Sequence, residues 1–146
     1  MFNGECKLAA VWLYSKDPDR AGEFYRNVLE MKQIEHGETN SFDGGGIRLS
    51  IHPAPESMKE IPNGESFLVF YVTDGIEEKY EKLVKKGVSF SGGVTDQPYG
   101  KIAEFQDPDG HSLFLWQPPP RDSKKFPHVS GLVEHYERVS ARLYGA

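Results

Sequence analysis

The chain has 146 residues, of which 38% are hydrophobic and 27% charged, and its formal net charge is −5. This length suffices for one domain with a sizeable core, and the acidic balance argues against nucleic acid or an anionic membrane surface as a partner. No apolar run reaches membrane-spanning length, and the single cysteine, Cys6, cannot form an internal disulfide, so we expect a cytoplasmic protein.

The first part of the chain predicts a strand, a helix and three further strands. Residues 8–14 are apolar on both faces of a strand. Asp17-Pro18 then predicts a helix start, with the aspartate as N-cap and the proline in the first helical position. Three short strands are expected after this helix, over residues 33–36, 41–42 and 47–52. A proline-containing linker is expected over residues 53–65.

The same order of elements begins again at Phe67. Residues 67–72 predict a strand with two apolar faces, and Asp74 is the expected N-cap of a helix that ends at Gly87. The three strands expected after it cover residues 88–90, 101–105 and 112–116. Strand-helix-strand-strand-strand therefore occurs twice, over residues 8–52 and 67–117.

The last two of these strands are joined by the turn Asp107-Pro108-Asp109-Gly110. Pro108 presets φ for the second turn position, and Gly110 tolerates a positive φ. Both aspartates can accept hydrogen bonds from the turn backbone, so we interpret them as structural rather than catalytic.

Asp-Pro-Asp-Gly-His followed by an apolar strand, together with the repeated unit, resembles the vicinal oxygen chelate superfamily. This group contains glyoxalases, bleomycin-resistance proteins, fosfomycin-resistance enzymes and extradiol dioxygenases. The resemblance implies an α+β fold in which two βαβββ modules form curved mixed sheets around a shared cleft. The expected domain covers residues 1–120, and residues 121–146 form a C-terminal extension.

The extension goes beyond the family's minimal pattern and predicts an amphipathic helix. Its apolar positions recur with helical spacing: Val129, Leu132, Val133, Tyr136, Val139 and Leu143. A helix of this length is marginal alone. We therefore expect it to dock on its own domain or on a partner subunit.

In the metal-dependent members, four strands each bring a His, Glu or Gln toward the cleft. The corresponding positions here are Ala10, Leu49, Phe67 and Phe114. None of these side chains can ligate a hard divalent cation. The resemblance therefore predicts a protein without the family's usual metal and without another cofactor.

Strand alternation extends this predicted cleft to neighbouring aromatic residues. The expected ligand-binding residues are Trp12, Tyr14, Leu49, Phe67, Tyr71, Glu104, Phe114 and Trp116. Flat aromatic faces would suit an aromatic or large apolar ligand. The alternative is that these side chains fill the core between the modules, which for any single one of them is the more common outcome.

Glu104 is the one charged residue in this set. The matching position in the fosfomycin-resistance branch carries a cleft-facing tyrosine, so the resemblance points Glu104 inward. There it could pair with a cationic ligand group or act as a general base without metal. The alternative is a glutamate at the rim that faces water. Arg48, which alternates with Leu49, is expected to face away.

Three functions remain open. The first is a metal-free small-molecule binding protein, similar to the bleomycin-resistance branch, that sequesters its ligand or confers resistance. The second is a metal-independent isomerase or lyase with Glu104 as general base. The third is a metalloenzyme of the glyoxalase or dioxygenase type with relocated ligands, for which His52, His111 and Glu104 are candidates. The family often pairs subunits or modules to build its cleft, so we expect a homodimer.

Overall fold

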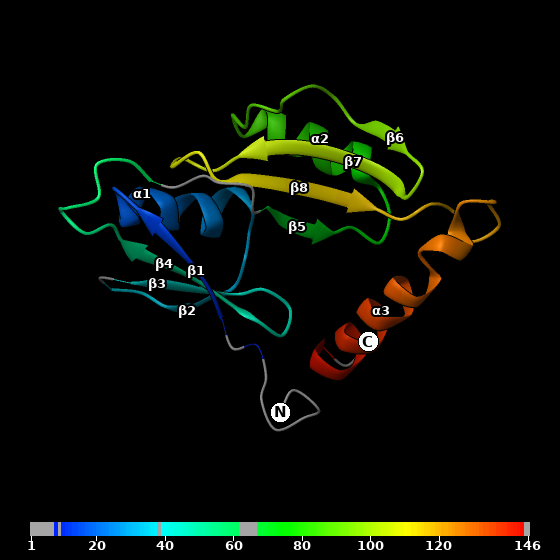
Figure 1. Cartoon of the computed structure of the whole chain (residues 1–146), viewed down its shortest axis with the longest axis horizontal. Coiled ribbons are helices and arrows are strands. Elements are labelled where there is room, and N and C mark those ends of the chain that lie inside the picture. The colour runs from blue at the N-terminus through cyan, green and yellow to red at the C-terminus, as the bar shows by residue number, and fades with distance from the viewer. Residues whose placement is uncertain (1–7, 9, 38, 62–66, 145–146) are drawn as a thin grey trace. The chain divides into compact units, whose positions relative to one another are not determined.

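Two four-stranded mixed sheets, one from each half of the chain, carry the fold (Figure 1). The structure is a computed structural model and describes residues 8, 10–37, 39–61 and 67–144, so Cys6 lies outside the described part. The chain divides into unit 1, residues 1–61, and unit 2, residues 62–146. The predicted α+β class with two βαβββ modules and a C-terminal helix is confirmed.

Unit 1 has the strand order β1-β4-β3-β2, with β1 parallel to β4 and the other pairs antiparallel. Its elements are β1 (Ala10–Ser15), α1 (Pro18–Glu23), the π-helical turn η1 (Phe24–Val28), β2 (Gln33–Glu35), β3 (Asn40–Asp43) and β4 (Arg48–Pro53). The helical segment between β1 and β4 supplies the crossover that a parallel strand pair needs.

The helix of unit 1 begins where the sequence predicts. The Asp17 carboxylate accepts a hydrogen bond from the Arg20 backbone N–H at 3.1 Å, and proline follows the cap. Tyr25 from this helical segment is fully buried, and its ring centroid lies 5.8 Å from that of Phe42 on β3. One face of the sheet is therefore closed by the helix and forms the core of unit 1.

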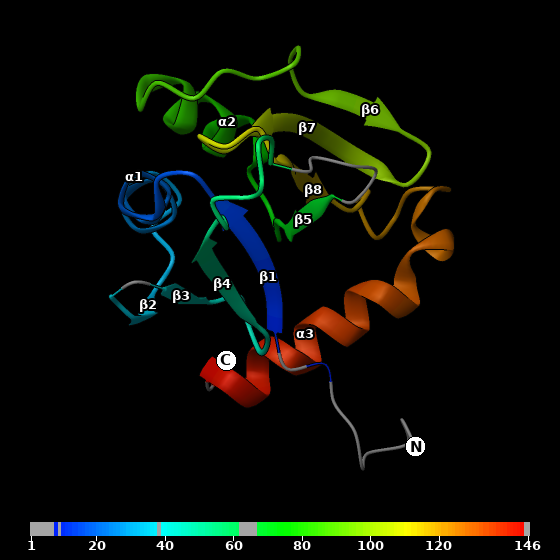
Figure 2. The ribbon, with the colours of Figure 1, turned by 60° about the vertical axis from the view of Figure 1, so that its left-hand side comes forward.

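Unit 2 repeats this topology with the order β5-β8-β7-β6 and β5 parallel to β8 (Figure 2). Its elements are β5 (Leu68–Tyr71), α2 (Ile76–Lys85), β6 (Thr95–Gln97), β7 (Gly100–Gln106), β8 (Ser112–Gln117), the 3₁₀ turn η2 (Phe126–His128) and α3 (Ser130–Tyr144). Ile76 and Leu83 of α2 are buried, which closes one face of this sheet.

The start of α2 differs from the prediction. Gly75, not Asp74, is the N-cap, and its left-handed φ of 75° suits a glycine. The Asp74 carboxylate accepts a hydrogen bond from the N–H of the next residue, Gly75, at 2.9 Å. The Ile76 N–H instead donates to the side-chain oxygen of Gln117 at 2.8 Å, so a distant strand supplies the polar partner expected from a local cap. The end at Gly87, with φ of 91°, is as predicted.

The strand predicted over residues 88–90 is wrong. Phe90 makes one isolated bridge to Phe105, and its ring packs between those of Tyr80 and Phe105, with centroid distances of 4.5 and 5.1 Å. The first strand after α2 is instead β6, which forms a hairpin with β7 next to Gly100. A Cβ at Gly100 would collide with the carbonyl oxygen of Gln117. Phe90 thus serves the core rather than the sheet.

The turn between β7 and β8 has the predicted structural role. Asp107 is buried, and its Oδ1 accepts hydrogen bonds from the backbone N–H groups of Asp109 and His111, both at 2.9 Å. Gly110 has a φ of 87° and donates its N–H to the Asp107 carbonyl at 3.0 Å. Among the residues that the structure describes, no helix is long and apolar enough to span a membrane.

Candidate functional site

In unit 1 the sheet face opposite the helix carries exposed aromatic side chains. The parallel register pairs Trp12 with Ser50 and Tyr14 with His52, and paired residues of neighbouring strands share a face. The Trp12 side chain is 65% exposed and that of Tyr14 39%. Ser50 is buried, so we call Trp12, Tyr14 and His52 the open face of unit 1.

Leu49 does not belong to this face, so that part of the prediction is wrong. It pairs with Val11, is only 5% exposed and lies on the face that the helix closes. Arg48, which was expected to face away, pairs with Ala10 and shares the face of Trp12. The predicted alignment of β4 was shifted by one residue, and a shift of one residue exchanges the two faces of a strand.

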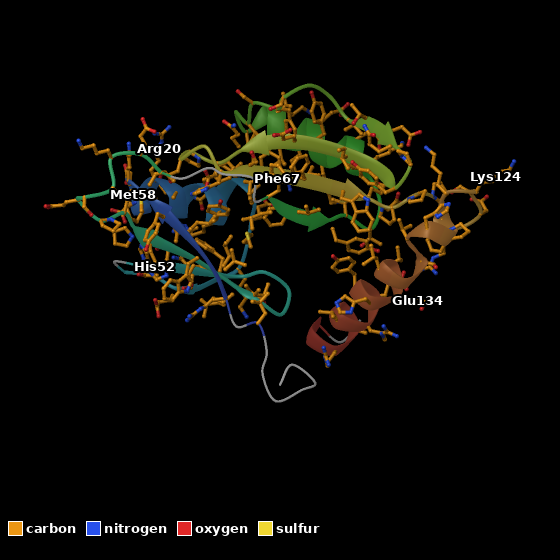
Figure 3. The ribbon with its side chains drawn as sticks, in the orientation of Figure 1. Arg20, His52, Met58, Phe67, Lys124 and Glu134 are labelled. Carbon is orange, nitrogen blue, oxygen red and sulfur yellow. The ribbon has the colours of Figure 1, made fainter. Side chains whose placement is uncertain are left out.

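His52 also lies on this face; the sequence named it only as a candidate relocated metal ligand, not among the aromatic ligand-binding residues. Its ring centroid lies 4.5 Å from that of Trp12, and its Nδ1 lies 3.5 Å from the Thr39 hydroxyl (Figure 3). The Nε2 atom is buried and has no hydrogen-bond partner among the described residues. A buried imidazole nitrogen without a partner is unfavourable, and a bound molecule can supply one. The sequence signal for its place on this face was strand periodicity, because His52 comes two residues after Ser50 and therefore shares its face.

In unit 2 the predicted face assignments hold. Tyr71 pairs with Trp116, and Glu104 pairs with Phe114, which places all four side chains on the sheet face opposite α2. Phe67 meets Phe114 edge to face, with 5.2 Å between ring centroids and 83° between the planes. Phe67 comes directly before the first residue of β5, and its side chain is labelled in Figure 3.

The C-terminal extension covers half of this face. Val129 and Val133 form a buried cluster with Trp116, and Tyr71, Ile102 and Phe126 pack against it. The predicted helix therefore docks on its own unit. Trp116 is 7% exposed, and its indole N–H donates to the Tyr99 carbonyl at 2.9 Å. The structure thus favours the core alternative for Trp116, which was expected to contact a ligand.

The other half of the face is open. Phe67 is 53% and Val69 59% exposed, and Phe114 and Glu104 are partly exposed. Glu104 is the only charged strand residue on this face, and it has no ion pair among the described residues. We call Phe67, Val69, Glu104 and Phe114 the open face of unit 2.

Tyr71 lies at the border between the covered and the open half. Burial raises the pKa of its hydroxyl above the ordinary tyrosine value, and the negative charge of Glu137 raises it further. Arg121 and a hydrogen bond with Thr73 act on the pKa in the opposite direction. The hydroxyl is therefore neutral at physiological pH and can donate a hydrogen bond.

A family model described as Glyoxalase/Bleomycin resistance protein/Dioxygenase superfamily matches residues 7–115. The chain belongs to this superfamily. The resemblance drawn from the Asp-Pro-Asp-Gly turn and the repeated unit is thereby confirmed.

Proteins similar to this chain are named for different activities. Over 130 residues the chain is 28% identical to "Metallothiol transferase FosB" of Shouchella clausii (strain KSM-K16), covering 84% of this chain and 81% of that protein. The structure of TnmS3, an antibiotic binding protein from Streptomyces sp. CB03234, superposes with a TM-score of 0.67 at 22% identity, covering 80% of this chain and 98% of that one.

A lactoylglutathione lyase from Agrobacterium tumefaciens superposes with a TM-score of 0.63 at 19% identity, covering 79% of this chain and 96% of that one. At these identities the two solved structures establish the fold alone. Among these similar proteins, one is named for thiol transfer, and two that share the fold are named for antibiotic binding and for a lyase activity.

Because one relative is named a metallothiol transferase, the donor atoms decide whether a metal fits here. Ala10, Phe67 and Phe114 occupy the expected ligand positions and carry no ligating atom. Within the part of the chain that the structure describes, no group of three or more His, Cys, Asp or Glu side chains is placed to hold a metal ion. His111, a candidate relocated ligand, is buried beside the β7–β8 turn. The described donor set does not fit the family's metal, and the metal-free state stays a prediction.

Proposed function

We propose that the protein binds an aromatic or large apolar small molecule without a metal, on the open sheet face of a unit, and so sequesters it or confers resistance to it. The observation that carries this proposal is the exposure of Trp12, Phe67 and Val69 on the sheet faces that the helices leave free. Large apolar side chains gathered on an exposed face are typical of a binding surface. The antibiotic-binding relative of the same fold supports this class of function.

The two faces offer polar groups that would orient such a ligand. Beside Trp12, the Nε2 of His52 is buried and has no hydrogen-bond partner among the described residues, so a ligand would bond to it after a small movement of the side chains that cover it. Beside Phe114, the carboxylate of Glu104 lies among apolar side chains, where a cationic group would find an ion pair. The proposed ligand therefore combines a planar aromatic body with an amine.

The experiment is a calorimetric titration with 1-naphthylmethylamine, a cationic two-ring probe. Trp12→Ala should weaken binding about tenfold, the upper range of an aromatic contact. The control is Ile34→Ala, which truncates an exposed apolar side chain on β2 of the same unit. Equal affinity of Trp12→Ala, Ile34→Ala and the wild type would overturn the assignment of Trp12.

A second candidate function is a metal-independent isomerase or lyase that acts on a carbonyl compound, with Glu104 as general base. The observation in its favour is that Glu104 is partly buried beside Phe114 and forms no ion pair with any residue that the structure describes. Glu104→Gln separates the two candidates. An enzyme should lose turnover and keep its affinity for a neutral substrate, whereas a binding protein should lose affinity only for cationic ligands.

We further propose that the protein is a cytoplasmic homodimer. β1 and β5 are edge strands of their sheets, and each carries exposed apolar side chains, which is a common setting for pairing with another chain. Sedimentation velocity should give twice the mass of 16.5 kDa calculated for the chain. A mass equal to one chain at micromolar concentration would contradict the dimer and leave the ligand proposal standing.

A further inference from the structure

The covered half of the unit 2 face ends at Tyr136. The Tyr136 ring stacks on that of Tyr71, with 4.8 Å between centroids and 16° between planes, and meets Trp116 at 6.1 Å and 65°. This near-parallel stack is the arrangement that a planar ligand would adopt on an aromatic side chain. Tyr136 therefore occupies the ring face of Tyr71 that a ligand could otherwise use.

Tyr136 also stands beside the open half of the face. Tyr71 follows Val69 by two residues on β5, so the two side chains share a face and lie about 7 Å apart along the strand. Tyr136 is 38% exposed, whereas Val129 and Val133 of the same helical segment are buried. The helix is thus anchored at its first turns, and Tyr136 forms the border where the cover meets the open face.

Polar contacts around this border are exposed. Arg121 forms an ion pair with Glu137, and both side chains are about half exposed. Exposed ion pairs of this kind contribute little free energy of folding. The helix is consequently held in place by Val129 and Val133, and changes at Tyr136 alter the border without removing the anchor.

We infer that Tyr136 sets the size of the ligand that the open face of unit 2 accepts. The inference rests on the proposed function, because it concerns the same aromatic ligand. With Tyr136 in place, the face offers Phe67, Val69, Phe114 and Glu104, and a third fused ring would meet the Tyr136 side chain. Without it, the Tyr71 ring is uncovered and extends the stacking surface.

The experiment is a calorimetric titration of the full chain with three cationic probes of increasing size: benzylamine, 1-naphthylmethylamine and 9-aminoacridine. The wild type should bind 9-aminoacridine more weakly than 1-naphthylmethylamine. In Tyr136→Ala the affinity for 9-aminoacridine should rise about tenfold, as one added aromatic contact allows, and that for benzylamine should change less than twofold.

Two further variants keep this test decisive. Tyr136→Leu removes the flat ring but keeps an apolar helix former, so it should give the same gain if the alanine variant is poorly folded. Leu132→Ala is the control, because Leu132 is a 53% exposed side chain of the same helix. It should leave the order of affinities unchanged.

The outcomes separate the two proposals. If the wild type binds the probes and both Tyr136 variants keep its order of affinities, the size-setting role is wrong and the binding function stands. If neither the wild type nor the variants bind any probe, the binding function is overturned and the role of Tyr136 falls with it.

Discussion

His52 has two features: its ring contacts Trp12, and one of its nitrogens has no hydrogen-bond partner among the described residues. The second feature is why we propose that His52 binds a ligand rather than only packing. Its imidazole lies against Trp12, while its buried Nε2 has no hydrogen-bond partner among the described residues. If His52 served packing alone, its ring should stabilise the folded protein at least as much as an apolar ring of similar size would.

His52→Phe tests this difference. The variant keeps a ring against Trp12 and removes the buried Nε2, and it also removes Nδ1, whose contact with the Thr39 hydroxyl is long at 3.5 Å, so the free energy of unfolding should change little. Affinity for 1-naphthylmethylamine should fall about fivefold, which corresponds to one lost hydrogen bond of roughly 1 kcal/mol. Urea denaturation and calorimetry measure the two quantities. A loss of stability with unchanged affinity would show that His52 is a packing residue.

Tyr71 gives a pH dependence with a definite sign. Its pKa is raised in the folded protein, chiefly by burial, so the folded state holds the hydroxyl proton to higher pH than the unfolded state. Its contribution to stability is therefore complete below the unfolded pKa of about 10 and is lost as the pH rises above that value.

Tyr71→Phe removes this titration. Between about pH 9 and pH 11 the unfolding free energy should fall more steeply in the wild type than in the variant, because only the wild type carries the Tyr71 hydroxyl. Urea denaturation at several pH values measures both slopes. Identical slopes would mean that the Tyr71 environment does not differ between the folded and unfolded states.

The turn between β7 and β8 fixes the strands that carry Glu104 and Phe114. Asp107 accepts two backbone hydrogen bonds in a buried position. Asp107→Ala leaves these N–H groups without that partner and should lower the free energy of unfolding by roughly 1–3 kcal/mol. Asp122→Ala, at an exposed aspartate, is the control and should change stability by less than about 0.5 kcal/mol. Equal stability of the two variants would contradict the structural role of this turn.

The elements were predictable to the extent that their signals were local. The Asp17-Pro18 start of α1, the glycine that ends α2 and the β7–β8 turn depend on residues next to one another, and all three are found. The start of α2 could not be predicted locally, because the polar partner of its first N–H, Gln117, comes from β8. Phe90 was assigned to a strand because an apolar residue looks the same whether it pairs in a sheet or packs its ring.

The candidate site was predictable in part for the same reason. Alternation along β5 and β8 correctly groups Tyr71, Phe114 and Trp116 on one face. It could not show that α3 covers Trp116, because the docking position of an added helix depends on contacts far apart in the sequence. Leu49 was misplaced, and His52 was left out of the ligand-binding set, because the predicted alignment of β4 was shifted by one residue, which exchanges the two faces of the strand.

For the whole molecule, both units follow one plan: a helix closes one face of a mixed sheet, and aromatic side chains remain exposed on the other. One relative in sequence is named a metallothiol transferase, and a protein of the same fold is named for antibiotic binding. The described residues carry exposed aromatic side chains, and three positions expected to hold metal ligands, Ala10, Phe67 and Phe114, have no donor atom in their side chains. Metal-independent binding is therefore the central claim.

The most direct test is a calorimetric titration of untagged, chelator-treated protein with 1-naphthylmethylamine, repeated after adding Mn²⁺, Ni²⁺ or Zn²⁺. We predict binding by the chelator-treated protein, with the same affinity within twofold in the presence of each ion. Binding that occurs only after a metal is added, with near-stoichiometric metal retained on the protein, would contradict the account.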